Sequence, residues 1–218
     1  MASSSEGISH DEKREWITSE ELGAKLEADP EWVATRDQRA REHQARLDAR
    51  NATLVPLEDE LRALGLPSLF EMCDSKLHPR VLLAVPTLIA HLQKKDAYPK
   101  DARELIASAL VRPEMRAHWQ VLLQLFRDER ETWVKEELGN AIIKASDAGV
   151  IADVIALVRD RQQGSIRVIL LYVLEKSKDP RALATIDEFA DEPDLREEIK
   201  AIHKRAEKRK QRKLKKLQ

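Results

Sequence analysis

A pattern of paired amphipathic segments recurs about every 33 residues between Leu66 and His203, a period typical of helical-hairpin repeats. In one segment of each unit, apolar residues fall at positions i, i+4, i+7 and i+8, which lie on one face of a helix. The aligned positions are Val81, Val85, Leu88, Ile89 and Leu92; Met115, Trp119, Leu122, Leu123 and Phe126; Val150, Val154, Leu157 and Val158; and Ala182, Ile186, Phe189 and Ala190. Helices with such an apolar face must pack against one another to bury it.

The other segment of each unit carries a cation followed by apolar residues three and six positions later. These cations are Arg103, Lys135, Arg167 and Arg196. Residues 168–174, VILLYVL, would pass for a buried strand in isolation, but their place in the repeat predicts a helix. Hairpins that cannot bury their apolar faces alone stack into an α-solenoid, so we expect an all-α fold with about four hairpins over residues 66–203.

Residues 101–110, DARELIASAL, carry an aspartate, an arginine two positions later and an Ala-Leu ending. Prolines 79, 113 and 180 begin the companion segments. This combination resembles the HEAT-repeat family in its short prokaryotic form, although Lys135 stands for the arginine in the second unit. The resemblance covers residues 66–203 and implies a right-handed, curved solenoid that binds a partner protein on its concave face.

The first 65 residues lie outside the repeat. Residues 1–15 are small and polar, and we expect them to be disordered. Residues 16–65 are expected to form a charged helical segment. Within it, Thr18 and Glu21 have the spacing of a capping box at the start of a short helix.

A second, charge-rich helix is predicted from Pro30 to about Asn51, with Asp29 as its N-cap. Pro56 is expected to stop or kink it, because proline removes a hydrogen-bond donor and clashes with the preceding turn. Apolar residues recur along this helix only every seventh position. That spacing favours a surface helix lying across the solenoid end over a dimerising helix, and so a monomer over a dimer.

Composition narrows the functional classes. A single cysteine, Cys73, excludes an intramolecular disulfide and favours a reducing compartment. The N-terminal residues lack an apolar signal segment, and no stretch is long and apolar enough for a membrane span, so we expect a soluble, cytoplasmic protein without membrane association. None of the six histidines has another histidine or cysteine three or four positions later. We therefore expect no metal, no cofactor and no catalytic residues, and we interpret the pairs Asp128-Glu129 and Asp191-Glu192 as solvated caps.

Residues 204–218 form a basic tail. Ten Lys and Arg residues against Glu207 give residues 200–218 a charge of +9, so at a net charge of −1 residues 1–199 carry −10. Two interpretations stay open: a nucleic-acid or ribosome-binding tail, or a frayed helix end whose cations suit the helix dipole. The candidate anion-binding residues are Lys204, Arg205, Lys208, Arg209, Lys210, Arg212 and Lys213.

The sequence favours a non-catalytic scaffold or adaptor that binds another protein. If the apolar-striped segments line the concave face, their remaining polar residues would contact the partner. These candidates are Arg80, Thr87, His91, Arg116, Gln120, Gln124, Arg127, Asp153, Arg159 and Arg181. The alternatives are an immunity or antitoxin-type inhibitor whose acidic body neutralises a basic toxin, and an RNA- or ribosome-associated protein that acts through the basic tail.

Overall fold

The computed structural model describes residues 17–74 and 79–217, which are helical with no β-strand among them. The all-α class is thus as predicted. Residues 1–15, for which disorder was expected, lie outside the described residues. The chain divides into two units, Met1–Ala49 and Arg50–Gln218.

The described part of the first unit contains α1 (Ser19–Glu27) and the start of α2 (Pro30–Ala63). The predicted capping box is confirmed: Thr18 Oγ1 accepts from the Glu21 N–H, and Glu21 Oε2 accepts from the Thr18 N–H at 2.9 Å. Asp29 Oδ1 accepts from the Glu31 N–H at 2.9 Å, as expected of an N-cap. No residue between 17 and 49 is buried, so local bonds hold these helices.

The prediction that the second helix ends near Asn51 or stops at Pro56 is wrong, because α2 runs through Pro56 to Ala63; the alternative of a kink at Pro56 stays a prediction. Leu54, Leu57 and Leu61 lie in the core of the second unit, each no more than 3% exposed. A helix-interior proline costs about 3 kcal/mol, whereas each buried leucine contributes about 1.5–3 kcal/mol. Burial of this face therefore outweighs the lost hydrogen bond.

Gly65 ends this helix, as its position predicts. Its φ of 68° lies in the left-handed region that glycine adopts without steric cost. The Leu66 N–H then donates to the Leu61 carbonyl at 3.0 Å and closes the turn. The chain thereby turns away from α2 into the repeated helices.

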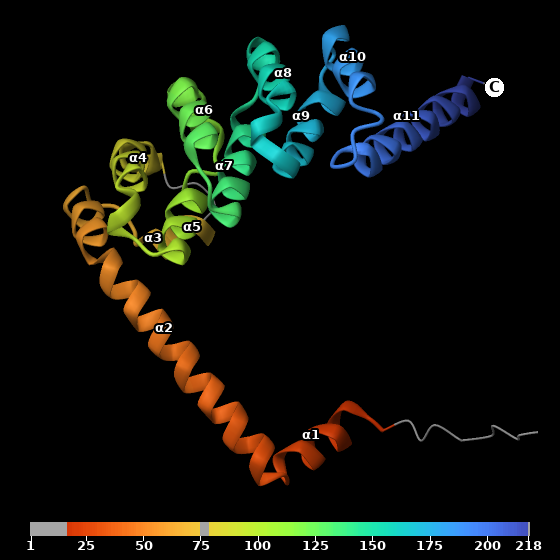
Figure 1. The fold of residues 1–218 in the computed structure, drawn as a ribbon. Helices are drawn as coiled ribbons and strands as arrows, with labels where there is room; N and C mark the ends of the chain where they lie inside the picture. The colour runs from red at the N-terminus through yellow and green to blue at the C-terminus, as the bar shows by residue number, and fades with distance from the viewer. Residues whose placement is uncertain (1–16, 75–78, 218) are drawn as a thin grey trace, which may run out of the picture. The chain divides into compact units, whose positions relative to one another are not determined.

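The second unit arranges its helices in two rows (Figure 1). We call one the outer row; it comprises α4 (Val85–Gln93), α6 (Trp119–Asp128), α8 (Ile151–Arg159) and α10 (Pro180–Glu188). The inner row comprises α3 (Leu69–Asp74), α5 (Lys100–Ala109), α7 (Thr132–Ala145), α9 (Leu171–Lys176) and α11 (Arg196–Leu217). Short 3-10 segments join them: η1 (Pro79–Ala84), η2 (Lys95–Ala97), η3 (Pro113–His118), η4 (Ala148–Val150) and η5 (Arg161–Leu170).

The apolar positions predicted from the repeat make up the core between the rows. They are buried wherever their side chains are described, apart from half-buried Ala190. The helical prediction for residues 168–174 is confirmed by η5 and α9. Pro180 begins α10 as expected, and Asp179 Oδ1 caps that helix by accepting from the Arg181 N–H at 2.9 Å.

The two rows differ in how closely their helices pack. In the inner row α5 packs against α7, and α7 against η5, whereas α4, α6 and α8 lie farther apart, on the outside of the bend (Figure 1). Gly139 on α7 explains part of this difference, since a Cβ there would overlap the Ile169 side chain. Small residues let helix axes approach, while Trp119 and Phe126 enlarge the outer helix α6. The segments assigned to the concave face therefore form the outer row instead.

Candidate functional site

The predicted partner-binding residues lie on the outer row, where only part of the set is free. Gln120, Gln124 and Arg127 are exposed on α6. Gln124 Nε2 donates to Asp128 Oδ2 at 2.7 Å, one turn along the same helix. Arg127 makes no salt bridge to any residue in the described part of the chain. These three side chains face solvent without being brought together with the rest of the set.

Two predicted binding residues instead connect α6 with the following hairpin. Trp119 Nε1 on α6 donates to Asp153 Oδ2 on α8 at 2.8 Å. Arg116 NH2 lies 2.9 Å from Asp147 Oδ1, and its guanidinium sits 5.4 Å from the centre of the Trp119 ring. These contacts link adjacent hairpins, and they engage the Asp153 carboxylate and the NH2 group of Arg116.

Arg159 and Arg181 are also engaged within the chain. Arg159 NH2 on α8 lies 2.6 Å from Glu188 Oε2 on α10, and Arg181 NH2 lies 2.7 Å from Asp179 Oδ2 at the start of α10. All four side chains retain at least 20% exposure, so these pairs contribute little to stability. The pair of Arg159 and Glu188 links two outer helices, whereas Arg181 and Asp179 pair within the first turn of α10.

His91 cannot contact a partner, which contradicts its prediction as a binding residue. Its side chain is 1% exposed, with Nδ1 against the Tyr98 hydroxyl and Nε2 3.1 Å from Glu60 Oε1. It lies on the core side of α4 rather than on its solvent side, and so joins α4 to α2. Arg80 lies in η1, and its side chain is not among those described. Thr87 is half-buried on α4.

The repeated cations of the inner row form buried contacts across hairpins. Arg103 on α5 binds Glu129 in the loop before α7, and both side chains are under 8% exposed. Lys135 Nζ donates to the Glu129 carbonyl at 3.0 Å. Arg167 in η5 binds Glu192 in the loop before α11. The contacts of Arg103 and Arg167 each tie a segment of the inner row to the loop that follows the next outer helix, whereas Lys135 bonds to the loop before its own helix. Glu129 is 4% exposed, so its interpretation as solvated is wrong.

These buried carboxylates make stability depend on acid pH. Burial disfavours the charge of Glu129, but the Glu131 N–H, the Arg103 guanidinium and the Arg130 N–H together lower its pKa below the usual 4.5. The Arg167 guanidinium likewise lowers the pKa of Glu192, against a smaller opposing effect of burial. Both carboxyls hold their protons more weakly in the folded state than in the unfolded state.

The free energy of unfolding should therefore be constant from pH 7 to about 5 and fall as the pH drops from about 4.5 through the folded-state pKa values. Urea midpoints measured across pH 3–7 would test this. Glu192→Gln should flatten the acid limb, whereas Asp191→Asn, an exposed neighbour without a salt bridge to a described residue, should leave it as in the wild type. An unchanged acid limb in Glu192→Gln would show that this pair does not cause the decline.

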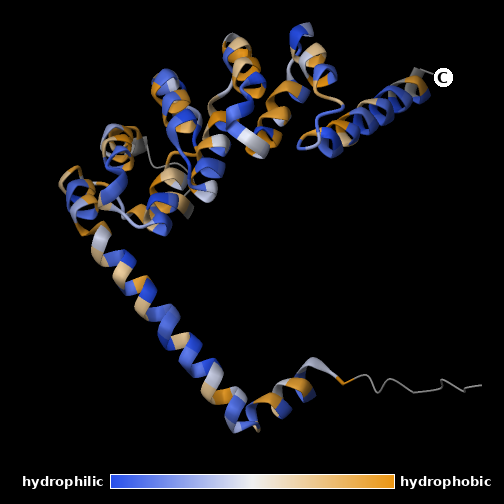
Figure 2. Cartoon of the chain, viewed as in Figure 1, coloured by the Kyte–Doolittle hydropathy of each residue, from blue (hydrophilic) through white to orange (hydrophobic). Residues whose placement is uncertain are grey.

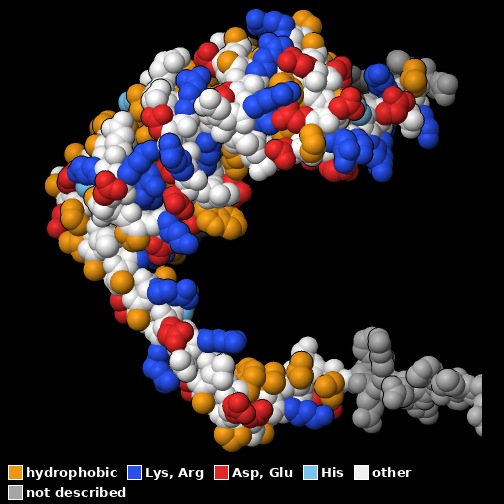
Figure 3. Space-filling view, viewed as in Figure 1, with side chains coloured by type: hydrophobic (Ala, Val, Ile, Leu, Met, Phe, Trp, Pro, Cys, Tyr) orange, Lys and Arg blue, Asp and Glu red, His pale blue; other side chains and the backbone are white. Residues whose placement is uncertain are grey.

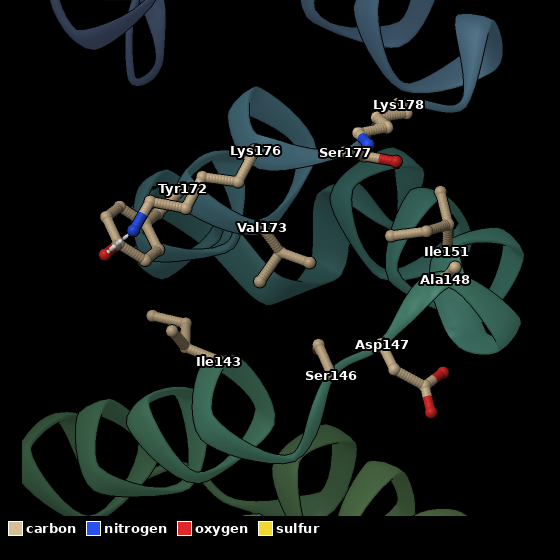
Figure 4. Close-up of a pocket in the computed structure, with 10 residues that line it drawn as sticks. All are labelled: Ile143, Ser146, Asp147, Ala148, Ile151, Tyr172, Val173, Lys176, Ser177 and Lys178. Carbon is tan, nitrogen blue, oxygen red and sulfur yellow. Dashed lines mark hydrogen bonds between the residues drawn. The ribbon is translucent and has the colours of Figure 1, made fainter.

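A candidate site is an open pocket of about 330 Å³ on the inner row, where α7, α8 and α9 meet. Ile143 on α7 lies across from Tyr172 and Val173 on α9, and Ile151 on α8 closes one side (Figure 4). Val173 and Ile151 are buried, so they form an apolar floor. The remaining lining residues are Ser146, Asp147, Ala148, Lys176, Ser177 and Lys178.

The rim of this pocket combines an exposed aromatic ring with two ammonium groups. Tyr172 is 46% exposed. Lys176 Nζ lies 3.8 Å from the centre of that ring and donates to the Tyr172 hydroxyl (Figure 4). Lys178 is exposed on the same rim, while the Asp147 carboxylate is paired with Arg116. The pocket thus offers hydrocarbon inside and unneutralised positive charge at its edge, which suits an apolar side chain next to a carboxylate.

None of these pocket residues was among the candidates from the sequence. Tyr172 lies in the segment predicted to be helical from the repeat, but that segment was not the one expected to line the concave face, so its polar and aromatic residues were not considered. Other surface features are less concentrated: on the visible face of the second unit, side chains of both charges are interspersed (Figure 3). Over residues 17–74 and 79–217 no three His, Cys, Asp or Glu side chains are grouped so as to hold a metal ion. No helix in those ranges has both the length and the apolar character needed to cross a bilayer.

The basic tail is helical rather than frayed where it is described, since α11 reaches Leu217. Arg205 and Arg209 turn back onto α9, while Lys204, Lys208, Lys210 and Arg212 are exposed. The Lys213 side chain is not among those described. The predicted anion-binding set is therefore divided between two faces of one helix.

No protein-family model, no curated protein sequence and no solved structure matches this chain. The likeness to HEAT repeats accordingly rests on the residues quoted from the sequence.

Proposed function

We propose that residues 66–203 form a HEAT-like α-solenoid that serves as a non-catalytic scaffold, and that it binds a partner protein through the pocket between α7 and α9. The observation that carries this proposal is the apolar pocket on the inner row, with Tyr172 exposed at its rim. Side-chain pockets of this kind hold the apolar anchors that dominate protein recognition.

The alternation of outer and inner helices supports the solenoid part of the proposal. Each hairpin of the second unit packs mainly on its neighbours along the chain, as in stacked repeats. The buried contacts from Arg103 to Glu129 and from Arg167 to Glu192 recur at the same place in different hairpins. A rigid stack would present the pocket without large rearrangement, which lowers the entropic cost of binding.

The chemistry of the pocket indicates the kind of segment it binds. Ile143, Ile151 and Val173 would surround one leucine-sized or aromatic side chain. Lys176 and Lys178 would pair with an acidic residue beside that anchor. The partner is thus expected to present an exposed apolar residue flanked by Asp or Glu, on a loop or a helix end.

A random peptide library selected on the full-length protein would test this proposal. We expect enrichment of peptides with an apolar residue next to an acidic one. Tyr172→Ala should lower the affinity for the selected peptides at least about 30-fold, the loss typical of an interface anchor worth about 2 kcal/mol. Fluorescence anisotropy with a labelled peptide measures the affinity.

Leu183→Ala provides the matched control, because Leu183 is an apolar side chain 53% exposed on the outer helix α10. It should change the affinity less than about twofold. If the selected peptides bind Tyr172→Ala as tightly as the wild type, or if Leu183→Ala weakens them more, the pocket on the inner row is not the binding site.

A further inference from the structure

One face of helix α11 packs against the rest of the second unit. Ile202 is buried in the core. Arg205 NH2 lies 2.7 Å from Glu175 Oε2, and Arg209 NH2 lies 2.9 Å from Glu175 Oε1, on a carboxylate only 6% exposed. Arg205 also reaches Glu198 at 2.7 Å. These two arginines anchor α11 on α9, so their charges are neutralised within the chain.

A neighbouring face of α11, centred about 100° around the helix axis from the first, carries a set of cations that we call the cationic stripe: Lys204, Lys208, Arg212 and Lys215. At 3.6 residues per turn these positions fall within about 80° of one another, over about 16 Å along the axis. All four are exposed, and none forms a salt bridge with a residue in the described part of the chain. The acid of this segment, Glu207, accepts from Gln211 instead.

We propose that the cationic stripe binds the phosphate backbone of a nucleic-acid duplex without reading its sequence. A straight, rigid row of positive charge complements a regular row of phosphates, and each neutralised phosphate releases a condensed counterion. Residues 1–199 carry −10 and repel a polyanion, so the duplex is directed to α11. This surface is separate from the pocket between α7 and α9, and the proposal does not depend on the scaffold function.

The composition of α11 argues against other anionic partners. Beyond Ala206 its apolar residues are Leu214 and Leu217, too few for the apolar face that inserts into a lipid surface, and the helix is mainly hydrophilic (Figure 2). It contains no Phe, Tyr or Trp to stack on the bases of a single strand or to anchor a protein interface. The interaction that the exposed cations of α11 can still make is electrostatic attraction to phosphate groups.

Fluorescence anisotropy on the full-length protein, with labelled 20-base-pair RNA and DNA duplexes over a range of KCl concentrations, tests the proposal. Four phosphate contacts predict a slope of log affinity against log salt of about −3.6, and a loss of about 100-fold between 50 and 200 mM salt. The stripe variant changes all four residues to glutamine: Lys204→Gln, Lys208→Gln, Arg212→Gln and Lys215→Gln. It should lose most of the binding and of the salt slope.

A control variant removes the same number of charges elsewhere, from exposed cations without a described salt bridge: Lys94→Gln, Lys100→Gln, Arg127→Gln and Arg130→Gln. It should bind within about threefold of the wild type. Circular dichroism verifies that both variants stay folded. Replacing the stripe lysines by arginine should restore the slope, because the charge is kept.

The comparison of duplexes identifies the source of the phosphates. Equal binding to both, or preference for one, supports a duplex backbone ligand and names it. Equal losses in the stripe and control variants would overturn the proposal, since net charge alone would then explain binding. Binding of the wild type to vesicles containing phosphatidylserine, with no binding to either duplex, would also overturn it.

Discussion

Replacing Arg167 by methionine is expected to lower the free energy of unfolding by about 3 kcal/mol, within the range for breaking a buried ion pair. The Arg167 side chain is 1% exposed and donates to three acceptors in different parts of the chain. Nε binds the Gly164 carbonyl at 2.8 Å, NH1 binds the Val158 carbonyl at 3.1 Å, and NH2 binds Glu192. Methionine would fill much of the space but would leave these acceptors without a donor.

Thermal and urea unfolding would measure the effect, with an expected drop in melting temperature of roughly 6–12 °C for a chain of this size. Arg181→Met is the matched control, since Arg181 pairs with Asp179 at the surface with 66% of its side chain exposed. It should cost less than about 1 kcal/mol. Equal costs for the two substitutions would mean that the contacts of Arg167 do not hold the hairpins together.

The sequence revealed the cations of this network but not their partners. Arg103 and Arg167 recur at one place in the repeat, yet their acidic partners, Glu129 and Glu192, lie about 25 residues later, in loops. Adjacent acidic residues in a loop have the pattern of a solvated cap, whereas Glu129 is buried and accepts from the Arg130 and Glu131 N–H groups just before α7. The regular offset from cation to acid was the available signal for their pairing.

Which row lies on the inside of the bend could not be read from the apolar pattern. That pattern tells which residues are buried, and it predicted the core well. The bend depends on how closely neighbouring helices approach, and hence on contacts such as that of Gly139 with Ile169 between α7 and η5. The candidate binding residues were therefore placed on the outer row, and the lining of the pocket at Tyr172 was not among them.

Pro56 shows the same limit at a single residue. Its local effect is to end a helix, and the sequence alone gives that effect its full weight. Leu57 and Leu61 follow it on one face, and their complete burial within the second unit reverses the local preference. The tertiary contacts of the leucines therefore decide whether the helix ends at Pro56 or continues through it.

Removing a buried phenylalanine ring from the centre of the proposed stack and removing one from its end should change the unfolding transition in different ways. Phe126 on α6 is fully buried, with Lys135 Nζ 5.1 Å from its ring centre. Phe189 is the buried phenylalanine of the last hairpin, where it is 5% exposed and its ring centre lies 5.8 Å from the Arg167 guanidinium. Phe126→Ala should lower the free energy of unfolding by about 3–5 kcal/mol, the cost of losing a buried ring.

In a solenoid each hairpin is stabilised by its neighbours only, so Phe189→Ala should release α10 and α11 before the rest unfolds. None of the four tryptophans lies in these two helices, whereas Trp119 and Trp133 lie in α6 and α7. During urea unfolding of Phe189→Ala, the circular dichroism signal should therefore begin to fall at lower urea than the tryptophan fluorescence changes. Phe126→Ala weakens the central hairpin itself, so in this variant the fluorescence change should not lag behind the circular dichroism change.

Leu183→Ala, an exposed site on α10, controls for substitution in the terminal hairpin and should keep the two signals coincident. Coincident transitions in Phe189→Ala as well would mean that residues 50–217 unfold as one cooperative globule. In that case the proposed solenoid is wrong, because a terminal cavity in a stack of nearest-neighbour units cannot destabilise the distant hairpins as much as its own. Separated transitions would instead show that the stack ends at α10 and α11 and that its stability is held locally, hairpin by hairpin.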